Sequence, residues 1–205
     1  GEKERLSVSI LFSVIAVGIA GLVLYGAYYG GITALLLRSL FFSLVAGGAM
    51  LFYALRYKSV MSRSVFYLLA LIALVPGPYL WHYYIDIIMR GAMSIGQDKW
   101  VFLALIIVVF VFVRMAVGWA LITLMTAAFL YAYFGDLIPG KYGHGGYDLN
   151  RLASTLMLST EGVYGVPMGV AVEYIFLFSL FGAILTKIGT GEVFVNIARG
   201  LTGRV

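Results

Sequence analysis

The sequence predicts an all-α integral membrane protein, and its composition and uncharged runs carry this prediction. Of the 205 residues, 62% are hydrophobic and 11% are charged, against roughly 25% charged residues in an ordinary soluble domain. A water-soluble fold could not cover its surface with so few charges. The pattern predicts about six hydrophobic helices, one amphipathic helix and one segment that is either broken or re-entrant.

Two hydrophobic helices are expected in the first 55 residues, where Arg38 alone interrupts an uncharged stretch that begins at Leu6. Gly30-Gly31 is the natural turn between a helix over residues 8–29 and a second over residues 32–55, because glycine accepts turn conformations that other residues avoid. Arg38 lies about two turns inside the second helix, where its long side chain can reach the interface by snorkelling. We therefore expect Arg38 to serve the interface.

A third hydrophobic helix is predicted over residues 64–88, and it contains Pro76-Gly77-Pro78. A helix that stopped at these residues would measure roughly 18 Å, too short for a hydrocarbon core of roughly 30 Å. We expect one kinked helix that continues through the prolines.

Residues 100–134 are apolar except for Arg114. One straight helix of this length would measure about 52 Å, which is too long for a span, so two short helices that meet near residues 114–118 are expected. The basic residues agree with this count, because five spans and a cytoplasmic N-terminus place more of them inside than outside. The inside set is Lys3, Arg5, Arg56, Lys58, Arg63 and Arg114, and the outside set is Arg90, Lys99 and Lys141.

The stretch over residues 135–148 is rich in glycine and polar residues and is expected to be an aqueous loop. Asp148 suits the N-cap of a following helix. Apolar residues then recur on one face of a helix of about 11 residues, which is too short to span. We expect an amphipathic arm helix that lies along the membrane or braces another segment.

Residues 159–170 read STEGVYGVPMGV and precede an apolar run. Gly162, Gly165, Pro167 and Gly169 make a continuous helix improbable there. In hydrocarbon, irregular backbone survives only inside protein or beside a watery cavity, and transporters use such interruptions to aim carbonyls at ions and substrates. The other interpretation is a plain loop that leads into a span at about residues 168–186.

Glu173 lies several residues inside that apolar run, where a carboxylate is costly and normally faces the bundle interior. Three roles are open. Glu173 is protonated and hydrogen-bonded, or pairs with an arginine such as Arg38 or Arg114, or carries protons during transport.

Several motifs together resemble the fused permeases of tripartite ATP-independent periplasmic (TRAP) transporters, especially the TAXI branch. They are LIPG at 137–140, the glycine loop before an amphipathic helix, STEGVYGVPMGV at 159–170, FLFSLFGAIL at 176–185 followed by Gly-x-Gly, and VRMAVGWAL at 113–121. Residues 1–95 match the family in hydropathy alone.

The resemblance implies a permease component of a binding-protein-dependent secondary transporter in the inner membrane of a prokaryote. A small scaffold domain would occupy residues 1–95, and a large transport domain would begin at residue 96. In this family the large domain moves an organic anion with an ion gradient, with Na⁺ as the coupling ion, in an elevator-like motion. A periplasmic substrate-binding protein delivers the solute. The family continues well past the equivalent of Val205, so the resemblance implies that the large domain is truncated here and that its remainder is a further partner.

Carried over onto this sequence, the candidates for the helix break and for substrate- or ion-facing groups are Ser159, Thr160, Gly165, Pro167 and Gly169, to which the position of Glu173 adds a sixth. Glu173 stands where the family has a small or hydroxyl side chain. Its presence keeps open a proton-coupled carrier that uses Glu173. A non-transporting membrane scaffold or assembly subunit is the other alternative.

Other classes of function are not expected. The chain has no cysteine, and its histidines, His82 and His144, lie far apart in the sequence. There is no Gly-x-Ser-x-Gly elbow or metal-spaced cluster, so neither an enzyme nor a metal site is expected. The basic residues occur singly near the ends of apolar runs, which favours contacts with the lipid bilayer over nucleic-acid binding.

Overall fold

The computed structural model describes residues 2–57 and 59–189. The described chain is helical and contains no strand. Five of its helical segments are long and apolar enough to cross a membrane: Ser9–Tyr29, Ala34–Arg56, Val60–His82, Asp98–Ala116 and Val166–Ile188. A sixth apolar helix, Trp119–Tyr133, is shorter. The predicted all-α membrane protein with about six hydrophobic helices is therefore confirmed.

The first two helices are α1 (Glu2–Tyr29) and α2 (Ala34–Arg56). The turn between them includes Gly30 at φ +60°, as the glycine pair predicted. The third span is α3 (Val60–Ala73) followed by α4 (Pro76–His82). The predicted kink at the prolines is confirmed, but the span ends at His82 rather than near residue 88, because the helix breaks at Tyr83 before the short α5 (Tyr84–Met89).

The next apolar stretch forms two helices, α6 (Asp98–Ala116) and α7 (Trp119–Tyr133). They meet at Gly118, whose φ of +105° is available to glycine and strained for other residues. The prediction of two helices that meet near residues 114–118 is confirmed. Arg114, at the end of α6, lies over the ring of Trp119 at 4.3 Å from its centroid.

A loop that includes the short η1 (Gly135–Leu137) leads to α8 (Leu149–Leu156). Asp148 caps α8, since its Oδ1 accepts a hydrogen bond from the amide of Arg151 at 2.9 Å. Leu152 and Ala153 are buried and Arg151 is exposed, so the helix is amphipathic as predicted. It is shorter than expected and packs against α6, which indicates a bracing role.

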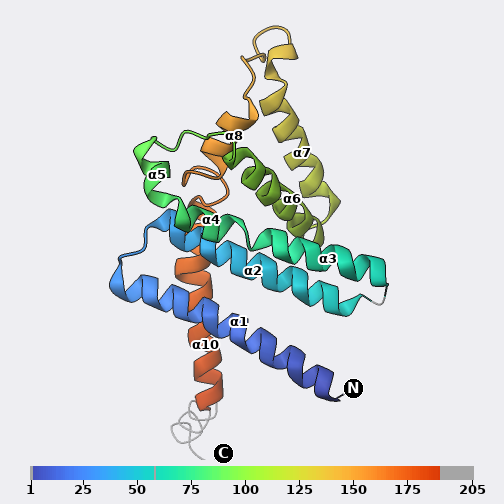
Figure 1. Cartoon of the computed structure of the whole chain (residues 1–205), viewed down its shortest axis with the longest axis vertical. Coiled ribbons are helices and arrows are strands. Elements are labelled where there is room, and N and C mark those ends of the chain that lie inside the picture. Colours follow the sequence, from blue (N-terminus) through green and yellow to red (C-terminus); the bar gives the residue numbers. More distant parts are fainter. Residues whose placement is uncertain (1, 58, 190–205) are drawn as a thin grey trace, which may run out of the picture.

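Helix α2 lies between α1 and α3 and packs against both of them (Figure 1). A core of buried residues joins α2, α3, α4, α6 and α8; it includes Met50, Leu80, Phe102 and Leu105. Gly77 of α4 fits tightly against α2, because a Cβ there would lie 3.0 Å from the carbonyl oxygen of Ser39.

The last span consists of α9 (Val166–Val170), η2 (Ala171–Phe176) and α10 (Leu177–Ile188). It crosses α1 and α2 rather than running beside them (Figure 1). Val172 is fully buried in a second core with Ile19 and Val23 of α1 and Leu37 and Phe41 of α2. This crossing brings the start of the last span, and the break before it, onto α2.

A buried carboxylate connects α4, α5 and α6. Asp98 is fully buried, and its oxygens accept hydrogen bonds from the Tyr79 hydroxyl at 2.6 Å and the Ile95 amide at 2.7 Å. Nη2 of Arg90 lies 3.0 Å from its Oδ2. The neighbouring Ser94 donates its amide hydrogen to Oγ of Ser154 in α8 at 2.8 Å. These contacts fix the connection between the third and fourth spans and join it to the arm helix.

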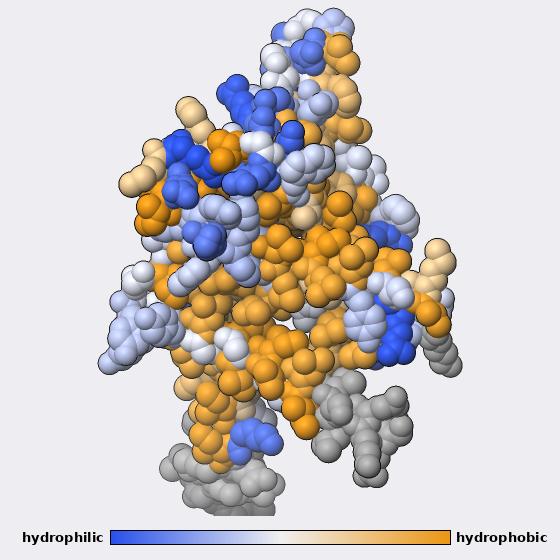
Figure 2. Space-filling model, in the orientation of Figure 1, coloured by the Kyte–Doolittle hydropathy of each residue, from blue (hydrophilic) through white to orange (hydrophobic). Residues whose placement is uncertain are grey.

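The surface is divided into an apolar region and a polar region. Apolar side chains cover the face over α1 to α4, and polar side chains gather around α5 and α8 (Figure 2). Exposed apolar residues include Val17, which is 71% exposed, and Leu71, which is 65% exposed. A face with this composition is suited to lipid.

Candidate functional site at a broken helix entrance

The chain between α8 and α9 is not helical, and it folds back onto the end of α8. Val163 donates its amide hydrogen to the carbonyl oxygen of Leu156 at 2.9 Å. Gly162 permits this approach, because a Cβ there would overlap the backbone of Leu156 and lie 2.6 Å from its carbonyl oxygen. Tyr164 and Gly165, which follow, are buried. The predicted break is therefore present, and protein shelters its last residues.

The irregular stretch is shorter than predicted. Gly165 is the N-cap of α9, and Pro167 lies in the first turn of this helix. The break was expected over residues 159–170, but its last part, Val166–Val170, is helical. A proline in the first turn of a helix loses no hydrogen bond by lacking an amide hydrogen, and its fixed φ suits a helix. The irregular backbone ends at Gly165.

One turn into the span the helix widens. Ala171–Phe176 is a π-helix, a form that is rare and occurs frequently at functional sites. Glu173 lies within it, and its side chain is 46% exposed. The local backbone thus departs from a regular α-helix at the one acidic residue of the span.

Arg38 of α2 holds the broken entrance. Its Nη1 donates to the carbonyl oxygens of Tyr164 at 3.1 Å and Gly165 at 3.2 Å. Its Nη2 lies 3.3 Å from Oε1 of Glu173. Arginine can do this because the planar guanidinium carries several donors in a fixed fork. One side chain therefore satisfies two carbonyls of the break and compensates the charge of the carboxylate.

Gly169 provides the space for this guanidinium. A Cβ on Gly169 would overlap Nη2 of Arg38 and lie 2.6 Å from its Cζ. Gly165, Gly169 and Glu173 are spaced by four residues, so they lie on one face of the helix. We call this face, made of the two carbonyl oxygens, the bare Cα of Gly169 and the Glu173 carboxylate, the Arg38 seat.

The expectation that Arg38 snorkels to the interface is wrong. Its side chain is 15% exposed and points at the break, where the Tyr164 carbonyl needs a donor because an unpaired carbonyl in apolar surroundings is costly. Of the roles open for Glu173, pairing with Arg38 is confirmed, whereas Arg114 is occupied with Trp119.

The six predicted site residues divide into two groups. Gly165, Gly169 and Glu173 converge on Arg38. Ser159 lies away from this group; its hydroxyl donates to the carbonyl oxygen of Thr155 at 2.7 Å and accepts from the amide of Glu161. Thr160 and Pro167 are exposed. The spacing Gly165-x₃-Gly169-x₃-Glu173 was the signal that could have identified this face of the last span. Two glycines and a carboxylate on one face leave room for a long basic side chain and attract its charge.

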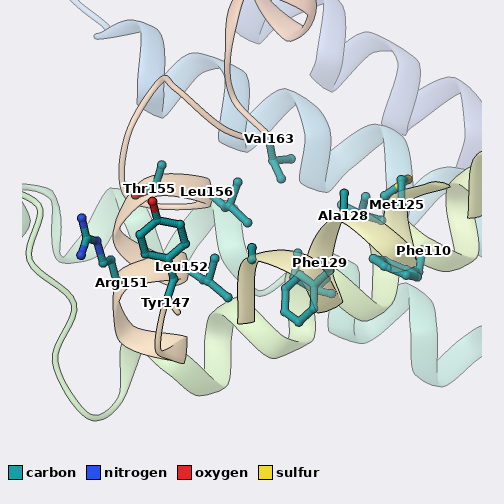
Figure 3. Close-up of a pocket in the computed structure, with 13 residues that line it drawn as sticks. Phe110, Met125, Ala128, Phe129, Tyr147, Arg151, Leu152, Thr155, Leu156 and Val163 are labelled. Carbon is teal, nitrogen blue, oxygen red and sulfur yellow. The ribbon is translucent and has the colours of Figure 1, made fainter. Parts of the chain in front are cut away.

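A separate cavity of about 510 Å³ lies between α6, α7 and α8. None of the six predicted residues lines it. Figure 3 shows apolar side chains around most of the cavity, with Arg151 and Tyr147 at one end. The guanidinium of Arg151 lies 4.6 Å from the centroid of the Tyr147 ring. Within residues 9–57 and 59–189, no three His, Asp or Glu side chains cluster closely enough to hold a metal ion.

The apolar spans and the interrupted helix define a multi-pass membrane protein with the kind of helix break that transporters use. Residues 102–205 match the family model described as the tripartite ATP-independent periplasmic transporter, DctM component. The chain belongs to this family, which confirms the resemblance to a TRAP permease. No curated protein and no solved structure matches the chain.

Proposed function

We propose that this chain forms the scaffold and the first broken helix of a secondary transporter that imports an organic anion. The observation that carries the proposal is the break before Val166, whose carbonyls at Tyr164 and Gly165 are held at the entrance of a membrane-length span by Arg38. Carriers use breaks of this kind, at membrane depth, as the places where they meet ions and solutes.

The finer features follow the family. Residues 1–95 act as the scaffold and residues from 96 onward begin the moving domain, with an elevator-like displacement between them. Na⁺ is the proposed coupling ion, a periplasmic binding protein delivers the solute, and the host membrane is the inner membrane of a prokaryote. Membership of a family described as tripartite and periplasmic supports the binding protein as a partner.

The direct test is uptake by the permease that contains this chain, reconstituted in proteoliposomes with its binding protein. We expect accumulation of a labelled organic anion under an inward Na⁺ gradient, and none when choline replaces sodium or the binding protein is left out. Uptake that ignores both sodium and the binding protein would overturn the proposal.

A non-transporting scaffold is distinguished by a matched pair of substitutions. Gly165→Ala places a Cβ 2.9 Å from the carbonyl oxygen of Gly162, so it should distort the break. Pro167→Ala changes an exposed residue in the first turn of α9 and should be tolerated. For a carrier we expect Gly165→Ala to lower uptake at least tenfold while the protein still assembles. Equal behaviour of the two variants would favour the scaffold.

A further inference from the structure

The acceptors of the Arg38 seat are already in use. A carbonyl oxygen has two lone pairs. That of Gly165 accepts from Nη1 of Arg38 at 3.2 Å and from the amide of Gly169 at 3.1 Å. No lone pair of Gly165 is left for a free cation in this conformation.

The seat has the chemistry of a cation site. Two neutral carbonyls and one carboxylate converge on one positive group, and the charges of Arg38 and Glu173 cancel. The donor comes from far away in the chain, with separations of 126 and 127 residues to the two carbonyls. Buried Leu37 and Phe41 flank Arg38 on α2 and pack against Val172, which keeps the guanidinium in place.

We propose that the Arg38 seat is a cation-binding site whose resident cation is the guanidinium of Arg38. This tethered charge, and no free ion, fixes the start of the last span against α2. Arg38 is thus a positioning residue. The inference goes beyond the proposed transport function, because it concerns a binding property that is measured without uptake. It also implies that, while Arg38 occupies the seat, any coupling ion binds to oxygens other than the carbonyl oxygen of Gly165.

Chemical rescue tests the proposal. In Arg38→Ala the three oxygens lose their cation, so the purified protein in detergent should melt several degrees lower than wild type. Millimolar guanidinium should restore at least half of that loss. Urea, which has a similar shape and no charge, and sodium chloride at equal ionic strength should not. In the double variant Arg38→Ala/Glu173→Gln, guanidinium should restore much less of the lost melting temperature. If guanidinium shifted the melting temperatures of wild type and Arg38→Ala equally, the proposal would be overturned.

A second measurement covers the case in which Arg38→Ala fails to fold. Gly169→Ala should destabilise the protein because its Cβ would lie 2.6 Å from Cζ of Arg38. In the Arg38→Lys background, where the planar guanidinium is absent, Gly169→Ala should destabilise the protein less than half as much. Gly182→Ala, at a glycine of the same span with nothing within 4 Å of its Cβ position, is the matched control. An equal cost of Gly169→Ala in both backgrounds would show that the guanidinium does not occupy the seat.

Discussion

Gly162 rests against the backbone of Leu156, so that a Cβ on Gly162 would lie 2.6 Å from the Leu156 carbonyl oxygen. The amide of the next residue, Val163, donates to the same oxygen at 2.9 Å. The contact turns the chain back along the end of α8 and directs Tyr164 and Gly165 toward Arg38. The arm helix and the broken entrance are therefore one structural unit.

We expect Gly162→Ala to disrupt this unit, because the added Cβ meets backbone rather than a flexible side chain. Moving backbone in a packed region costs about 2 kcal/mol. The measurement is the melting temperature and the monodisperse fraction in detergent. Gly18→Ala in α1, where nothing lies within 4 Å of the Cβ position, is the control. Equal effects of the two substitutions would contradict the close contact.

The role of Glu173 in coupling is tested by Glu173→Gln. The change leaves the guanidinium of Arg38, which is 15% exposed, without its counter-charge. Because the carboxylate is 46% exposed and partly screened, we expect a destabilisation of only about 1 kcal/mol. With Na⁺ as the coupling ion, uptake should fall while its pH profile keeps the wild-type shape. A pH profile flattened by Glu173→Gln would instead favour the proton-coupled carrier.

Features that depend on neighbouring residues were predictable from the sequence. The turn at Gly30, the kink at Pro76 and the cap at Asp148 each follow from the local conformational preference of one residue type. The junction near Gly118 was predicted from the length of the apolar stretch instead. Helix lengths followed from the thickness of a bilayer. The extent of the break was mispredicted because proline both ends helices and begins them, and residue type alone does not decide which.

The side chains that complete the site could not be predicted in the same way. Arg38 and Gly165 are 127 residues apart, and only the crossing of the last span over α2 brings them together. Asp98 was overlooked for a similar reason. In sequence it begins an apolar run and resembles an interfacial charge, but its partner Tyr79 belongs to the preceding span.

Asp98 gives a prediction for the connection between the third and fourth spans. Asp98→Asn removes the charge that faces Arg90 at 3.0 Å in a fully buried position. Breaking a buried pair by changing one partner costs about 3 kcal/mol. We expect a clear fall in melting temperature, together with easier proteolysis in the loop that contains Ser94.

Asp86→Asn is the matched control for Asp98, since Asp86 is an exposed carboxylate on α5. It should leave the melting temperature close to that of wild type. If Asp98→Asn is as mild as Asp86→Asn, the buried carboxylate does not hold the connection together.

The contact between α2 and α4 gives the last prediction. Gly77 lies in the first turn of α4, where amide hydrogens have no partner within the helix. Its amide donates instead to Oγ of Ser43 on α2 at 2.9 Å, and both residues are buried. Ser43→Ala leaves this amide unsatisfied, which costs about 2 kcal/mol. Ser13→Ala is the control, because the Ser13 hydroxyl is exposed and donates only to the carbonyl of Ser9 in its own helix. Ser43→Ala should lower the melting temperature and Ser13→Ala should not, and a neutral Ser43→Ala would mean that a water molecule can replace the hydroxyl between the two helices.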